Sequence, residues 1–180
     1  MKTLLVAILV ALPAVAADLP AVAPVKAACG PDNVKFNASP IGGQPAAQPE
    51  AGKALVYVVE ELFRPADELI TPTVRVGVDG SWVGANYGTS YLFFSVEPGE
   101  HHLCADWQSA PRWIGEKVSL TSIKVEADRT YYVRARVLDQ GKHGLLDEGS
   151  SVVLDLKQIN SDEGQLLVAT SPLSGYRQKK

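Results

Sequence analysis

Short stretches of alternating apolar and polar residues follow one another from residue 53 onward, which is the pattern of β-strands that bury one face. Turn-forming residues separate these stretches, so each is bounded as a strand is. The predicted strands are residues 53–62, 73–78, 81–83, 91–96, 100–107, 118–127, 130–138 and 151–158. Seven or eight short strands with turns between them predict an all-β fold, an antiparallel β-sandwich.

Three tight turns predict which strands pair. Asp79-Gly80 is a residue pair that two-residue hairpins favour. Pro98-Gly99 and Asp128-Arg129 also stand between strands, and proline presets φ while glycine accepts a positive φ. We therefore expect three hairpins, in which residues 73–78 pair with 81–83, residues 91–96 with 100–107, and residues 118–127 with 130–138.

The strand at residues 53–62 is apolar on both of its faces. Its two alternating sets are Leu55, Tyr57 and Val59 on one side and Ala54, Val56 and Val58 on the other. This predicts a strand that is covered on both sides. In residues 130–138, by contrast, valine and alanine alternate with Arg134 and Arg136, so we expect one buried face and one solvated face.

Residues 160–170 leave two interpretations open. Asn160 and the acidic pair Asp162-Glu163 suit the first turn of a short helix that Pro172 would end. Residues 166–169 are apolar enough to form a further strand instead. The expected organisation is a signal peptide at 1–17, a leader and extended arm at 18–52, the β-sandwich domain at 53–170 and a C-terminal tail at 171–180.

The first 17 residues have the layout of a secretory signal peptide. Lys2 is followed by an apolar run and then by the small-residue site Ala14-Val15-Ala16. No later segment is long and apolar enough to span a bilayer. We therefore expect an exported protein, periplasmic or extracellular, without a transmembrane segment in the mature chain.

Net charge favours neither nucleic acid nor an anionic membrane as a partner. Without Lys2 the chain has 16 basic and 20 acidic residues, a net charge of −4. The basic C-terminal residues 177–180 are expected to be a solvated tail. The partner we expect is a protein or a glycan of the cell envelope.

Cys29 and Cys104 are the two cysteines, and export would place them in an oxidising compartment. An intramolecular disulfide is the leading interpretation. The alternative is a lipid anchor at Cys29, against which Lys26 occupies a position that normally carries an aliphatic residue.

Strand alternation divides residues 100–107 into two sets. His101, Leu103, Ala105 and Trp107 share one face, and His102, Cys104 and Asp106 share the other. The second set contains metal-ligand side chains, but we expect no cofactor, because Cys104 is assigned to the disulfide. If Leu103 and Trp107 point into the core, Cys104 points outward and the arm containing Cys29 crosses the outer face of that sheet.

No arrangement typical of catalysis is evident. There is no Gly-x-Ser-x-Gly motif, and adjacent carboxylates such as Glu60-Glu61 point to opposite faces of a strand. The remaining candidates are aromatic residues that could stack on a sugar or anchor a partner, namely Trp82, Tyr87 and Trp113.

Residues 75–104, RVGVDGSWVGANYGTSYLFFSVEPGEHHLC, carry a pattern that resembles the DUF2846 family of exported bacterial proteins, and more distantly the PEGA-type surface modules. Lys53-Ala54-Leu55-Val56-Tyr57-Val58 and Thr130-Tyr131-Tyr132-Val133-Arg134 fit the same order, so the resemblance covers roughly residues 53 to 170. It implies an all-β sandwich in the cell envelope and supplies no catalytic residues.

Together these observations predict a non-enzymatic exported module with a binding or structural role in the cell envelope. Two alternatives are a carbohydrate-binding module that uses the loop aromatics, and an envelope hydrolase whose site the sequence does not reveal.

Overall fold

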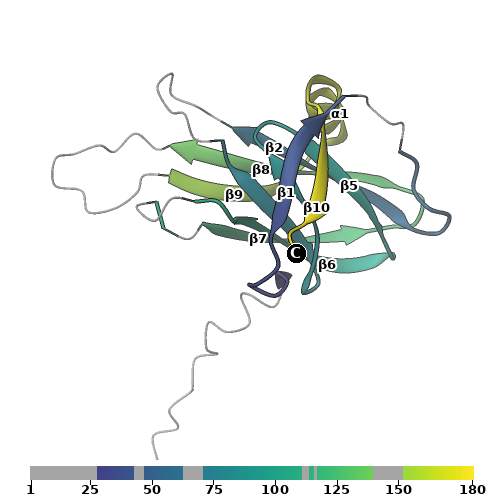
Figure 1. Ribbon diagram of the computed structural model, residues 1–180. Helices are drawn as coiled ribbons and strands as arrows, with labels where there is room; N and C mark the ends of the chain where they lie inside the picture. The colour runs from purple at the N-terminus through teal and green to yellow at the C-terminus, as the bar shows by residue number, and fades with distance from the viewer. Residues whose placement is uncertain (1–27, 43–46, 63–70, 111–113, 116, 140–151) are drawn as a thin grey trace, which may run out of the picture.

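The computed structural model describes residues 28–42, 47–62, 71–110, 114–115, 117–139 and 152–180. These residues form ten strands and one helix, arranged as two packed sheets (Figure 1). The expected signal peptide at residues 1–17 and the candidate residue Trp113 lie outside the described residues.

The larger sheet has six strands and the smaller has four, which confirms the all-β sandwich. Sheet A has the order β1-β10-β5-β2-β8-β9, with strands β1 (Phe36–Ile41), β10 (Leu173–Gln178), β5 (Tyr91–Val96), β2 (Ala54–Leu62), β8 (Thr130–Asp139) and β9 (Val152–Ile159). Sheet B has the order β4-β3-β6-β7, with strands β4 (Ser81–Tyr87), β3 (Thr73–Val78), β6 (Gly99–Trp107) and β7 (Val118–Val125).

Only one of the three expected hairpins forms. β3 pairs with β4 around Asp79-Gly80, as predicted. The two other predictions are wrong, because β5 pairs with β2 and β10 in sheet A, while β6 pairs with β3 and β7 in sheet B. β7 and β8 likewise belong to different sheets. The turns at Gly99 (φ 147°) and Asp128 (φ 58°) therefore carry the chain from one sheet to the other.

Sheet A is mixed rather than purely antiparallel. β2 and β8 run parallel over eight residue pairs, from Leu55 opposite Thr130 to Leu62 opposite Val137. β10 also meets β5 in a parallel sense, at Leu173 and Tyr91. Parallel neighbours need long connections, and sheet B supplies them, since the chain crosses to the second sheet between β2 and β5 and again between β5 and β8.

The core lies between the two sheets, on the faces that alternation predicts. Val133, Ala135 and Val137 of β8 point inward, and Leu103, Ala105 and Trp107 of β6 meet them from sheet B. Their inward orientation places the neighbouring residue Cys104 on the outer face of sheet B, as expected.

The outer face of sheet A is covered by the helix α1 (Ser161–Thr170), so the helical interpretation of this segment is confirmed. Asn160 caps it by accepting a hydrogen bond from the Glu163 amide. The helix covers a second apolar cluster that contains Tyr57 and Tyr132, which explains why β2 is apolar on both faces. None of the helical structure in the described ranges is long and apolar enough to cross a bilayer.

The C-terminal segment differs from the tail expected at residues 171–180. Leu173–Gln178 form β10, which pairs along its whole length with β1 and joins that strand to the rest of sheet A. Ser174 donates a hydrogen bond to the carbonyl of Ala85 in β4, so β10 also contacts sheet B. β1 lies within the leader and extended arm expected at residues 18–52.

In the part of the chain that the structure describes, the acidic side chain of Glu60 lies in the core without a hydrogen-bond partner. Glu60 follows Val56 and Val58 on the inner face of β2, is fully buried, and makes no hydrogen bond through either carboxylate oxygen. Burial raises the pKa of this carboxyl well above its ordinary value. Asn86 reaches the same strand from β4, donating to the carbonyl of Val58, and its own side-chain oxygen is also unpaired.

Replacing Glu60 with methionine should stabilise the protein at alkaline pH. Because its pKa is raised in the folded state, the carboxyl stabilises the fold below its ordinary pKa of 4.5 and loses that contribution as pH rises through the folded value. We expect Glu60→Met to gain about 1–3 kcal/mol at about pH 8, and less at about pH 5, in urea unfolding. Glu60→Gln keeps a buried polar group but removes the titratable carboxyl. Its gain in unfolding free energy should therefore come only from the part that depends on pH. If the unfolding free energy changed with pH equally in the wild type and in both variants, this account would be contradicted.

Candidate functional site

The N-terminal arm, residues 28–35, is fastened to the outer face of sheet B. Cys29 forms a disulfide with Cys104, with their Cα atoms 5.1 Å apart, and both residues are buried. This confirms the predicted pairing and the course of the arm across the outer face. The sulfur of Cys29 is thereby bonded within the chain, which leaves it no thiol for the lipid anchor considered as the alternative.

Arg75 is the polar centre beneath the arm. It lies opposite Asp106 in the β3–β6 pairing, and its guanidinium forms an ion pair with that carboxylate. The same guanidinium donates to the carbonyl oxygens of Asp32 and Val34, and it lies 4.2 Å from the centre of the Trp82 ring. The side chain is only 6% exposed, so these contacts replace the water that a charged group normally requires.

Trp82 also contacts the arm. Its Nε1 donates to the carbonyl of Pro31 at 2.9 Å, and Gly30 lies so close that a Cβ there would be 2.2 Å from the ring. Gly77 is opposite Trp82, and a Cβ on it would lie 3.2 Å from the Ala28 carbonyl. One face of the tryptophan that we predicted to bind a ligand is therefore occupied by the protein's own arm.

The other predicted aromatic residues are not brought together with Trp82. Tyr87 is 36% exposed at the far end of β4, five residues from Trp82 and hence about 16 Å away along the strand. Trp113 is not among the described residues. A ligand-binding role for Tyr87 stays a prediction, but the structure shows no shared surface with Trp82.

The three metal-ligand residues of β6 each have a different environment. Cys104 is in the disulfide, Asp106 is paired with Arg75, and the His102 side chain is exposed. Within the described ranges, no group of three or more histidine, cysteine and acidic side chains is placed to hold a metal ion.

His101 lies on the opposite face and connects two turns. Its Nδ1 is 2.6 Å from the Asp79 carboxylate, and its Nε2 is 2.6 Å from the Glu97 carbonyl. Partial burial acts to lower the pKa of His101, but the hydrogen bonds that its ring donates to the Asp79 carboxylate and the Glu97 carbonyl outweigh it and raise the pKa above 6.5. Burial likewise opposes the shift at Asp79, where the bonds from His101 and the His102 amide lower the pKa below 3.8.

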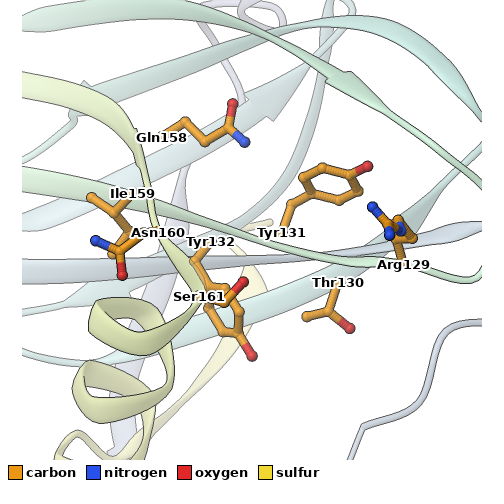
Figure 2. Close-up of a pocket in the computed structure, with 8 residues that line it drawn as sticks. All are labelled: Arg129, Thr130, Tyr131, Tyr132, Gln158, Ile159, Asn160 and Ser161. Carbon is orange, nitrogen blue, oxygen red and sulfur yellow. The ribbon is translucent and has the colours of Figure 1, made fainter.

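An open hollow of about 500 Å³ lies where β9 ends beside β8. β9 pairs with β8 only as far as Ile159, opposite Tyr132, because the chain then turns into α1 at Asn160. The start of β8 is thus left without a neighbour on that side. Figure 2 shows Arg129 and Thr130 at one end of the hollow, Ile159 and Asn160 at the other, and the two tyrosines between them.

The side chains around this hollow are mostly hydrogen-bonding groups. Arg129 is exposed and lies 3.5 Å from Glu126 in an ion pair, while Gln158 is exposed. Tyr132 packs into the cluster under α1, with its ring stacked on Tyr57 at 5.3 Å, and Tyr131 accepts a hydrogen bond from the Glu126 amide. The alternation pattern does not reveal this hollow, because a strand that stops two residues short of its neighbour leaves no mark in the pattern.

Comparisons with known proteins give no relative: no protein-family model matches the chain, and no curated protein and no solved structure matches it significantly.

Removing the disulfide should loosen the arm and destabilise the fold. The bridge joins residues 75 positions apart, and the chain-entropy model gives about 4 kcal/mol for a loop of that length. We expect the Cys29→Ala/Cys104→Ala double variant to lose up to this amount in urea unfolding, with Trp82 emission shifted to the red as Gly30 and Pro31 leave its ring. Reduction of the wild type should reproduce the loss of stability and the red shift. An unfolding midpoint that stays unchanged in the double variant and in the reduced wild type would contradict a stabilising role for the disulfide.

Asp79→Asn should weaken the fold at mildly acidic pH more than at alkaline pH. Because the pKa of His101 is raised in the folded state, its contribution to stability is present below pH 6.5 and is lost as pH rises. Because the pKa of Asp79 is lowered, its contribution is present above pH 3.8 and is lost as pH falls. The pair therefore contributes most between these values. Asparagine keeps the acceptor for the His102 amide, so the loss of stability comes from the missing charge alone. We expect this loss to be less than about 1 kcal/mol, because solvent screens the half-exposed carboxylate. Unfolding at about pH 5 and about pH 8 measures it, and an equal loss at both would refute it.

Proposed function

We propose that this protein is an exported, non-enzymatic module of the cell envelope, with a binding or structural role. The observation that carries the proposal is the Cys29–Cys104 disulfide, which fastens the arm to sheet B. Such structural disulfides persist in oxidising compartments outside the cytoplasm. A sandwich clamped in this way has a rigid frame on which loop and edge surfaces can bind a partner.

The hollow beside β8 and β9 supports a carbohydrate-binding role as the second candidate. Its rim offers the guanidinium of Arg129, the amides of Gln158 and Asn160, and the hydroxyls of Thr130 and Ser161. Planar amide and guanidinium groups with hydroxyls can pair with sugar hydroxyls, and a tyrosine ring can stack on a sugar face. This candidate differs from the predicted one in its residues, because it does not use Trp82.

The resemblance of residues 75–104 to the DUF2846 family agrees with the proposal and remains part of it. The strand order and turn motifs on which it rests lie in β3 to β6. Membership would imply an envelope protein and would supply no catalytic residues.

Titration calorimetry with soluble peptidoglycan fragments and neutral oligosaccharides tests the second candidate. We expect binding that the Arg129→Ala/Gln158→Ala variant weakens by about tenfold or more, since each lost hydrogen bond contributes about 1 kcal/mol. Lys124→Ala on β7, which removes an exposed cation elsewhere, should bind as the wild type does. Absence of binding across the panel would overturn the carbohydrate candidate.

Turnover of the same fragments tests the proposal itself. A non-enzymatic module leaves every fragment intact over long incubation. Cleavage that is lost on changing one polar residue would overturn it in favour of an envelope hydrolase.

A further inference from the structure

β1 and β10 form a two-stranded ribbon that joins the two ends of the described chain (Figure 1). Phe36 is opposite Gln178, and the amide of Lys179 donates to the carbonyl of Lys35 at 2.7 Å. The pairing therefore continues one step beyond the strands and places Lys35 directly across from Lys179.

Alternation sorts the side chains of this ribbon into two faces. Phe36 and Tyr176 pack edge to face, and Ser174 bonds to β4, so this set points toward sheet B. The opposite set forms one outer stripe, which we call the ribbon stripe. It consists of Asn37, Ser39 and Ile41 of β1, Arg177, Gly175 and Leu173 of β10, and the flanking residues Lys35 and Lys179.

The ribbon stripe places like charges together at one end. Lys35 and Lys179 are cross-strand neighbours, and Arg177 is next to both. All three are exposed, and none pairs with an acidic side chain in the part of the chain that the structure describes. Like charges directly opposite each other on a sheet destabilise it. The fold therefore carries a local cost in a protein whose net charge is negative.

The other end of the ribbon stripe is apolar and hollowed. Ile41 is 44% exposed and leans over Gly175, where a Cβ would lie 2.8 Å from it. The bare backbone of Gly175 lies in a hollow of about 500 Å³ that Asn37, Ser39 and Arg177 also line. From Lys35 to Ile41 the stripe is about 20 Å long, so cations and an exposed aliphatic side chain share one surface.

We propose that the ribbon stripe docks on a membrane surface that contains anionic phospholipids. Cations near such a surface each contribute a roughly fivefold gain in binding, and an exposed aliphatic side chain beside them can enter the headgroup region. The basic end fits the phosphates, and the hollow beside Arg177 has room for a headgroup. This inference rests on the proposed export, since an exported protein meets the outer faces of envelope membranes.

Vesicle sedimentation with the full mature chain tests the proposal. We expect binding to vesicles of phosphatidylcholine with about a third phosphatidylglycerol, weak or no binding to phosphatidylcholine alone, and release as salt rises. The Lys35→Gln/Arg177→Gln/Lys179→Gln variant should bind about 100-fold more weakly. Ile41→Ser should weaken binding at every salt concentration, because its contribution is not screened.

A charge-matched control separates the surface from the net charge. Lys117→Gln/Lys124→Gln/Lys157→Gln removes the same charge from β7, β9 and the residue before β7, and should retain binding. The ribbon variant should fold with an unchanged or slightly higher melting temperature, because it removes the like-charge pair. Equal losses in the two triple variants, or equal binding to both kinds of vesicle, would overturn the proposal.

Binding of a soluble polyanion is the last measurement. Polyphosphate that binds the protein without vesicles as tightly as the vesicles do would assign the stripe to a soluble polyanion and overturn the lipid surface. The result is independent of the calorimetry at Arg129 and Gln158, so failure of the lipid proposal and failure of the carbohydrate candidate can be told apart. Turnover of envelope fragments would count against the proposed function and leave the vesicle result unaffected.

Discussion

The buried guanidinium of Arg75 is the constraint on which the N-terminal part of the structure depends. A charge in this position requires partners, and those of its two terminal nitrogens and of its flat face come from three separate segments: Asp106 of β6, the ring of Trp82 in β4, and two carbonyls of the arm. Removing one partner of a buried ion pair costs about 3–5 kcal/mol, far more than an exposed pair contributes. The arm contributes two of these partners, the carbonyls of Asp32 and Val34, so its departure from sheet B would break both hydrogen bonds to the guanidinium.

This constraint also explains how the tightest features of the sandwich fit together. The disulfide at Cys104 and the guanidinium of Arg75 hold the arm at two successive places along its length. Between them, Gly30 and Gly77 allow the chain to approach the Trp82 ring and β3 more closely than any side chain would permit. Cys104, Asp106, Arg75 and Trp82 of sheet B are thus engaged in holding the arm, and the two surfaces proposed for a partner lie on sheet A, at the end of β9 and along the outer ribbon.

Much of the fold follows from local patterns, and the departures have identifiable physical causes. Alternation identified the two apolar faces of β2 and the core faces of β6 and β8, and the face of Cys104 followed from the inward orientation of Leu103 and Trp107. The turns at Pro98-Gly99 and Asp128-Arg129 were misassigned because a positive φ suits a turn between sheets as well as a hairpin. β10 escaped notice because Gly175 and its polar neighbours lack strand character, and β1 supplies the pairing from more than a hundred residues away. The alternation pattern places Asp106 beside Cys104 on the outer face of β6, but only the β3–β6 register reveals that Arg75 lies opposite it.

The meeting of β1 with β10 has a consequence for how the chain folds. The first strand of sheet A pairs only with nearly the last residues of the sequence, so a chain delivered from its N-terminus cannot complete that edge until its end has emerged. The partner of Cys29, by contrast, lies much earlier in the chain than β10. Formation of the disulfide can therefore tether the N-terminal arm to sheet B before β1 has found its partner. The tether shortens the chain segment between β1 and β10, which lowers the entropic cost of pairing these two strands.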